Sequence, residues 1–232
     1  MAEVPAGLAA LNEEVVTCRA CPRLVDWRES VAREKRASFA GETYWGRPVP
    51  GFGDIAGRLL VVGLAPAAHG GNRTGRIFTG DRSGDWLFAS LHRTGYANQP
   101  TSVSDDDGLE LTDCYISAVV KCAPPANKPA PDERDRCLPY LVRERVLMTN
   151  LRVVVALGSF AWDGYLRLVA SATGRSVRPK PRFGHLAEAR VRDEILLGSF
   201  HPSQQNTFTG KLTEPMLDAV FTRAREIGAT RS

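Results

Sequence analysis

Residues 58–81 read RLLVVGLAPAAHGGNRTGRIFTGD, a short apolar run that passes directly into a long segment rich in glycine and polar residues. The apolar part, residues 58–64, is typical of a strand buried on both faces. Similar runs rich in Val, Ile and Leu occupy residues 115–120, 152–157 and 194–200. Segments with helical spacing lie between these runs, at residues 85–93, 133–149 and 159–170. This alternation predicts an α/β fold with a parallel sheet between layers of helices.

The size and composition of the chain favour one soluble domain. Its 232 residues are 43% hydrophobic, which is enough for one substantial core. We therefore expect a single domain over residues 1–232. The N-terminus lacks the basic and apolar regions of a secretion signal, and no stretch approaches the roughly 18 apolar residues of a membrane span. These features predict a cytoplasmic protein without membrane contact.

Charge is distributed unevenly along the chain. The formal net charge is only +4, so binding of a polyanion would depend on local patches. Residues 175–192 contain a single acid, Glu188, and are either a solvated loop or an edge that contacts phosphates through Arg178, Lys180 and Arg182. The acidic residues 103–113 are expected to face away from nucleic acid.

Four of the five cysteines form a pattern of metal-ligand type. Two residues separate Cys18 from Cys21, and Cys122 precedes Cys137 by fifteen positions. Thiolates suit zinc or a [4Fe–4S] cluster equally well, and buried free thiols are a third interpretation. Cys114 stands just ahead of a predicted strand and is expected to be a small buried side chain.

Polar residues follow the predicted strands where each strand ends. In an open parallel sheet, ligands bind outside these carboxyl ends. The segment after the first strand lacks the endings of a P-loop or a dinucleotide-binding turn, so no nucleotide cofactor is expected. The second strand leads into residues 121–127, and the fourth leads into His201, Pro202 and Ser203.

Several of these motifs together resemble the uracil-DNA glycosylase superfamily. They are Gly63-x-Ala65-Pro66, residues 75–80 (GRIFTG), residues 119–127 (VVKCAPPAN) and His201-Pro202-Ser203. Residues 65–81 with residues 201–206 are similar to family 5, an iron–sulfur branch. The resemblance implies a three-layer α/β/α sandwich with a central four-stranded parallel sheet. It also implies a [4Fe–4S] cluster held by Cys18, Cys21, Cys122 and Cys137.

The same resemblance implies a monofunctional glycosylase of base excision repair. Such an enzyme is expected to act as a monomer on double-stranded DNA with a flipped damaged base. Breaking an N-glycosidic bond leaves a cationic sugar and an anionic base. We expect Asp81 to stabilise the cation or orient a water, with a helix N-cap as its alternative or additional role. We expect His201 to donate to the developing charge on O2, although an ordinary polar turn residue is the alternative.

A base pocket and a DNA-contacting surface complete the sequence-based predictions. The pocket is expected to contain Gly63, Ala65, Phe78, Ala118 and Asn127, with Phe78 either stacked on the base or filling the core. Related enzymes carry asparagine where this chain has Ala118, which predicts activity on hypoxanthine beside uracil, with xanthine and etheno-bases as further candidates. The remaining residues expected to contact DNA are Arg76, Ser203, Gln205 and Asn206.

One alternative function belongs to a different class. A non-catalytic nucleic-acid-binding module with a structural metal site would need the four cysteines and the basic segment. It would need neither Asp81 nor His201.

Overall fold

The computed structural model describes residues 5–230, which form one six-stranded sheet in the order β1-β3-β2-β4-β6-β5. Its four central strands are parallel, as predicted: β3 (Cys114–Ala118), β2 (Leu59–Gly63), β4 (Val153–Leu157) and β6 (Glu194–Ser199). The sheet is wider than the predicted four strands, because β1 (Phe52–Gly53) and β5 (Glu188–Val191) pair antiparallel at its two edges. Both edge strands are short and largely exposed or half-buried, so no apolar run marks them in the sequence.

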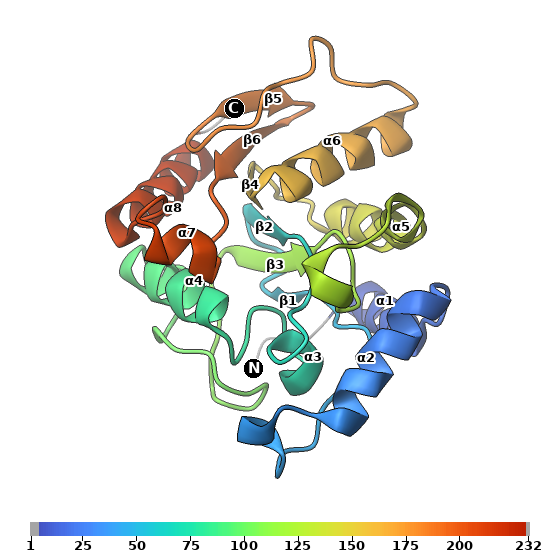
Figure 1. The fold of residues 1–232 in the computed structure, drawn as a ribbon. Helices are drawn as coiled ribbons and strands as arrows, with labels where there is room; N and C mark the ends of the chain where they lie inside the picture. The colour runs from blue at the N-terminus through green and yellow to red at the C-terminus, as the bar shows by residue number, and fades with distance from the viewer. Residues whose placement is uncertain (1–4, 231–232) are drawn as a thin grey trace.

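Helices cover both faces of the sheet and confirm the three layers (Figure 1). One face carries α4 (Arg82–Arg93) and α8 (Glu214–Ala229). The other carries α1 (Ala6–Thr17), α2 (Pro22–Glu34), α5 (Pro131–Leu147) and α6 (Ser159–Thr173). Short turns of helix lie in the connections: η1 (Ala37–Phe39), α3 (Gly71–Thr74), η2 (Pro125–Asn127) and α7 (Gln204–Phe208).

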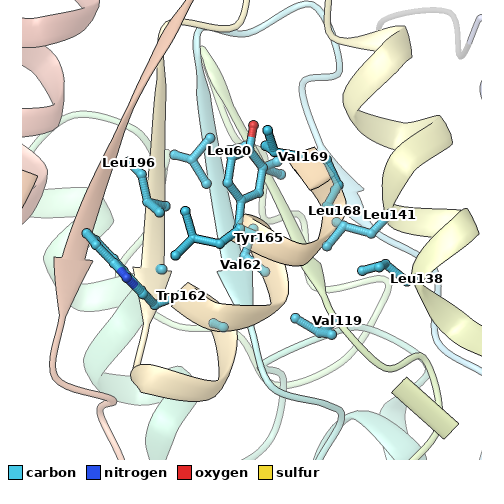
Figure 2. Packing of buried hydrophobic residues seen from close by; sticks show 14 of the residues in the cluster. Leu60, Val62, Val119, Leu138, Leu141, Trp162, Tyr165, Leu168, Val169 and Leu196 are labelled. Carbon is cyan, nitrogen blue, oxygen red and sulfur yellow. The ribbon is translucent and has the colours of Figure 1, made fainter. Parts of the chain in front are cut away.

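Two hydrophobic clusters hold the layers together, one on each face of the sheet. Figure 2 shows the first cluster, in which Trp162 and Tyr165 of α6 pack near Leu60, Val62 and Leu196 of the strands. The central strands are buried on both faces, which explains why they read as continuous apolar runs. Each such large apolar side chain contributes about 1.5–3 kcal/mol on burial.

The two terminal helices are also present. In α1, the buried residues Leu8, Leu11 and Val15 pack toward α5, and the helix ends just before Cys18. In α8, Thr213 occupies the N-cap position, although its side chain makes no capping hydrogen bond. Among the residues that the structure describes, no helix is both long enough and apolar enough to span a bilayer.

Candidate active site

A cavity of about 270 Å³ lies at the carboxyl ends of the parallel strands, where the predicted motifs meet. This volume is near the lower end of small-molecule sites. The lining residues come from the segments after β2, β3 and β6: Leu64, Ala65, Ala67, Phe78, Asp81, Ser83, Asn127, His201 and Ser203. Parallel strands bring these segments together although they are far apart in the sequence.

Asp81 is the N-cap of α4 and also faces the cavity. Its Oδ1 accepts the backbone N–H groups of Ser83, at 2.8 Å, and Gly84, at 3.1 Å. Within residues 5–230, Oδ2 accepts no hydrogen bond, and it packs against Gly70 so closely that a Cβ there would collide with it. Burial raises the pKa of Asp81, opposed by the two backbone hydrogen bonds. Oδ1 therefore caps the helix, while Oδ2 is left without a hydrogen bond within the described residues.

His201 follows β6 closely and faces the same cavity. The Asn206 amide donates to the His201 carbonyl at 2.9 Å, which fixes the turn that presents the imidazole. Burial lowers the pKa of His201 to about 4, so the ring is neutral at physiological pH. Its centroid lies 6.0 Å from that of the Phe78 ring, at an interplanar angle of 35°.

Phe78 both fills the core and lines the cavity. It is only 6% exposed and has a positive φ of 55°. Its ring lies over Gly63, where a Cβ would stand 2.7 Å from the ring carbon Cζ. Ala118 is opposite Gly63 in the sheet register. Gly63 and Ala118, both predicted for the base pocket, therefore lie in the sheet beneath this ring and do not line the cavity.

The structure corrects the expectation that Arg76 contacts DNA. Arg76 is 5% exposed, and its guanidinium donates to Asp107 at 2.7 Å, to Ser102 at 2.8 Å and to Thr79 at 3.0 Å. A phosphate contact would require these buried bonds to break, at a cost typical of a broken buried ion pair. The sequence pattern did not reveal this partner because Asp107 belongs to the acidic loop 31 residues later.

Some of the residues after His201 stabilise the turn, and others are exposed to solvent. Ser203 lines the cavity at the N-cap position of α7, and the side chain of Asn206 is engaged with the turn. Gln205 is exposed. Phe208 is 69% exposed, with the Arg82 guanidinium 4.6 Å from its ring centroid. The sequence pattern does not single out Phe208, because a single aromatic residue in a polar segment carries no periodic signal.

The basic segment that links α6 to β5 is on the surface. Arg178, Lys180 and Arg182 are exposed there, and Lys180 forms an ion pair with Asp163 at 2.8 Å. Such exposed pairs contribute little to stability. These side chains are therefore accessible to an anion, as the phosphate-contacting interpretation requires.

All four predicted ligand cysteines line one small cavity beside the segment that follows β3. Cys18 follows α1, Cys21 precedes α2, Cys122 follows β3 and Cys137 lies in α5. Within residues 5–230, no three or more His, Cys, Asp or Glu side chains converge closely enough to hold a single metal ion. The thiols instead surround a common space. Cys114 is fully buried elsewhere in the core, as expected.

The surroundings of the cysteine cavity suit an anionic group. Arg28 is 2% exposed, and its Nη1 donates to Cys122 Sγ at 2.9 Å. Its Nε has no partner within the described residues, and its ion-pair carboxylate, that of Glu29, is 3.8 Å away. A buried guanidinium is costly without an anionic counterpart. Four thiolates around an iron–sulfur cluster would supply that counterpart, so the residues present fit such a group.

Comparison with known proteins assigns the family. Residues 50–225 match the Uracil DNA glycosylase superfamily. The Type-5 uracil-DNA glycosylase of Mycobacterium bovis is 54% identical over 95% of this chain and 81% of its own length. The Type-5 enzyme of Mycobacterium leprae is 54% identical over 94% of both chains, and that of Thermus thermophilus is 46% identical over 94% of this chain and 97% of its own. The chain therefore belongs to the uracil-DNA glycosylase superfamily, in the branch of the type-5 enzymes.

Proposed function

We propose that this protein is a monofunctional DNA glycosylase that hydrolyses the bond between uracil and deoxyribose in duplex DNA. The observation that carries the proposal is the shared cavity, which holds Asp81, His201 and Phe78 from separate parts of the chain. The names of its relatives support the same activity.

In the proposed mechanism, opposite charges develop on the two sides of the breaking bond. The free Oδ2 of Asp81 stabilises the cationic sugar or orients the attacking water, while Oδ1 stays bound to the helix. Neutral His201 donates a hydrogen bond to the base oxygen that becomes negative. Phe78 stacks on the extruded base, and Asn127 offers the amide that reads its edge. Lys121 is buried in an ion pair with Glu144, so we assign it no role as a Schiff-base nucleophile.

We further propose that Cys18, Cys21, Cys122 and Cys137 hold a [4Fe–4S] cluster of structural role. Four thiolate ligands would leave no open iron site for the substrate, and such a cluster would supply a cross-link between the α1–α2 region and the sheet. The buried Arg28 beside Cys122 supports an anionic occupant.

One experiment tests the activity directly. A duplex carrying one labelled uracil is mixed with saturating enzyme, and alkali reveals abasic sites as strand breaks. Wild-type protein should yield breaks only after alkali, and Asp81→Asn should bind the duplex but react at least about 10²-fold more slowly. DNA binding without excision by the wild type would favour the non-catalytic binding module.

We also propose that the substrate range includes hypoxanthine. Ala118 lies in the sheet beneath the Phe78 ring and offers no polar side-chain atom there, and among the described residues Asn127 is the one amide side chain that lines the cavity. A site with few polar groups leaves few hydrogen-bond donors and acceptors unpaired when a different base enters, so binding of that base costs little free energy. The ratio of single-turnover rates on hypoxanthine and uracil tests this breadth, in the wild type and in Ala118→Asn. A wild type confined to uracil, or an unchanged ratio in the variant, would contradict it.

A further inference from the structure

A second and larger cavity, of about 630 Å³, lies between α2 and residues 44–47. Among the described residues, four arginines and a single carboxylate, that of Glu29, line it. The arginines are Arg19, Arg28, Arg33 and Arg47. We call this cavity the arginine cleft. The active-site mechanism described above uses none of these side chains.

Two of the four arginines are already engaged. Arg19 forms an ion pair with Glu29, and buried Arg28 donates to Cys122 Sγ. Arg33 and Arg47 are exposed, and neither forms a salt bridge within residues 5–230. Arg47 lies over the Trp45 ring at 5.6 Å from its centroid, which holds its guanidinium at the cleft. The cleft therefore presents two cations that no carboxylate of the described residues pairs, and it suits an anion with more than one negative group.

The arginine cleft borders the active-site loop. Tyr44 lines the cleft, and its hydroxyl lies 3.0 Å from Nδ1 of His69. His69 belongs to the same loop as Ala65 and Ala67, which line the active-site cavity. That loop continues into α3, which lies beside α2 (Figure 1). The arginine cleft and the active-site cavity are therefore connected through this loop.

We propose that the arginine cleft binds the phosphate backbone of a DNA strand that flanks the lesion. The proposal rests on the proposed function, because it takes DNA as the ligand of the neighbouring site. The Trp45 ring lies against both Arg47 and Gly75, so the cleft recognises phosphates and not a stacked base. A free polyphosphate carries the same chemistry and is the competing occupant.

The test measures DNA affinity by fluorescence anisotropy with a duplex that carries a stable abasic-site analogue. The variant Arg33→Gln/Arg47→Gln should bind this duplex on the order of tenfold more weakly per arginine at about 0.1 M salt. The slope of log Kd against log salt should fall by about two. The control variant Arg143→Gln/Arg223→Gln removes the same charge from α5 and α8, and it should bind like the wild type. In single-turnover excision, a higher concentration of the cleft variant than of the wild type should be needed for saturation, whereas the control variant should saturate like the wild type.

Truncated duplexes locate the bound strand. A duplex that is truncated on the side of the lesion that reaches the cleft should bind the cleft variant and the wild type equally. A duplex that is truncated on the opposite side should still bind the cleft variant more weakly than the wild type. A difference that persists on both truncated duplexes, or one that the control variant shares, would overturn the assignment.

Two further outcomes separate the proposals. Tripolyphosphate that binds the wild type but not the cleft variant, with unchanged DNA affinity, would identify a free polyphosphate as the occupant and overturn the DNA assignment. Equal wild-type affinity for plain and abasic duplexes, without excision, would instead contradict the proposed function.

Discussion

The neutral state of His201 can be measured through the pH dependence of stability. The pKa of this group falls from an ordinary value of 6.5 to about 4 on folding, because the ring is buried. Between these two values the unfolded chain binds a proton that the folded chain rejects. The free energy of unfolding therefore decreases as the pH falls below 6.5. At a pH of about 5.5, roughly ten unfolded chains are protonated at this position for each neutral one, which corresponds to about 1.4 kcal/mol.

The substitution His201→Gln removes this titration and keeps a neutral donor. Urea unfolding at pH values of about 7.5 and about 5.5 should show that the wild type loses about 1.4 kcal/mol more than the variant. All other titrating groups are common to both proteins and cancel. His92→Gln, at an exposed position of α4, is the matched control and should follow the wild type. Equal losses in wild type and His201→Gln would refute a buried neutral histidine.

The remaining predictions concern the helix cap Asp81, the contact of Gly63 with the Phe78 ring, and the proposed iron–sulfur cluster. Asp81→Ala and Asp81→Asn should both slow excision by about 10²-fold or more in single-turnover assays. Only the alanine variant should also lose about 1 kcal/mol in urea unfolding, because asparagine is a good N-cap. Gly63→Ala should cost about 1–3 kcal/mol and lower the thermal midpoint, since the new methyl overlaps the aromatic ring above it. Gly41→Ala, with no atom within 4 Å of the added carbon, should melt like the wild type. Cys122→Ala should lose visible absorbance and iron, whereas Cys114→Ala should keep both; a colourless wild type with stoichiometric zinc would contradict the cluster.

The sheet, and the edge of the sheet at which the candidate site lies, could be predicted from the sequence because both depend on strong local patterns. The central strands are buried on both faces and read as apolar runs, and the residues that follow them must gather at one edge. The helix α2 has no comparable signal, since its thirteen residues are mostly polar or charged and begin directly after Cys21. Its position depends on packing beside α3 and on the cysteines, which are long-range features.

Arg76 shows why sequence reasoning fails at individual side chains. A positive residue in a glycine-rich motif next to a proposed DNA site suggests a phosphate contact. Its actual role depends on Asp107, whose loop folds back so that the carboxylate also accepts the backbone N–H of Val103 at 2.7 Å. The arginine and the aspartate are each nearly buried, at 5% and 7% exposure. Nothing in the spacing of the two residues indicates that they meet.

The two roles of Asp81 explain how the cavity obtains a fixed carboxylate. Leu64 follows Gly63 after β2, so the residue nearest to the end of this strand offers no polar group. The carboxylate comes instead from the start of α4, where the helix dipole and two N–H groups favour a negative charge. Burial acts in the opposite direction and raises the pKa of Asp81, and the two backbone hydrogen bonds of the cap oppose this rise. The same hydrogen bonds fix the side-chain rotamer, and the unbound Oδ2 is then held in place before a substrate arrives. In the proposed mechanism, a helix cap at this position therefore supplies both the charge and the orientation that glycosidic bond cleavage requires.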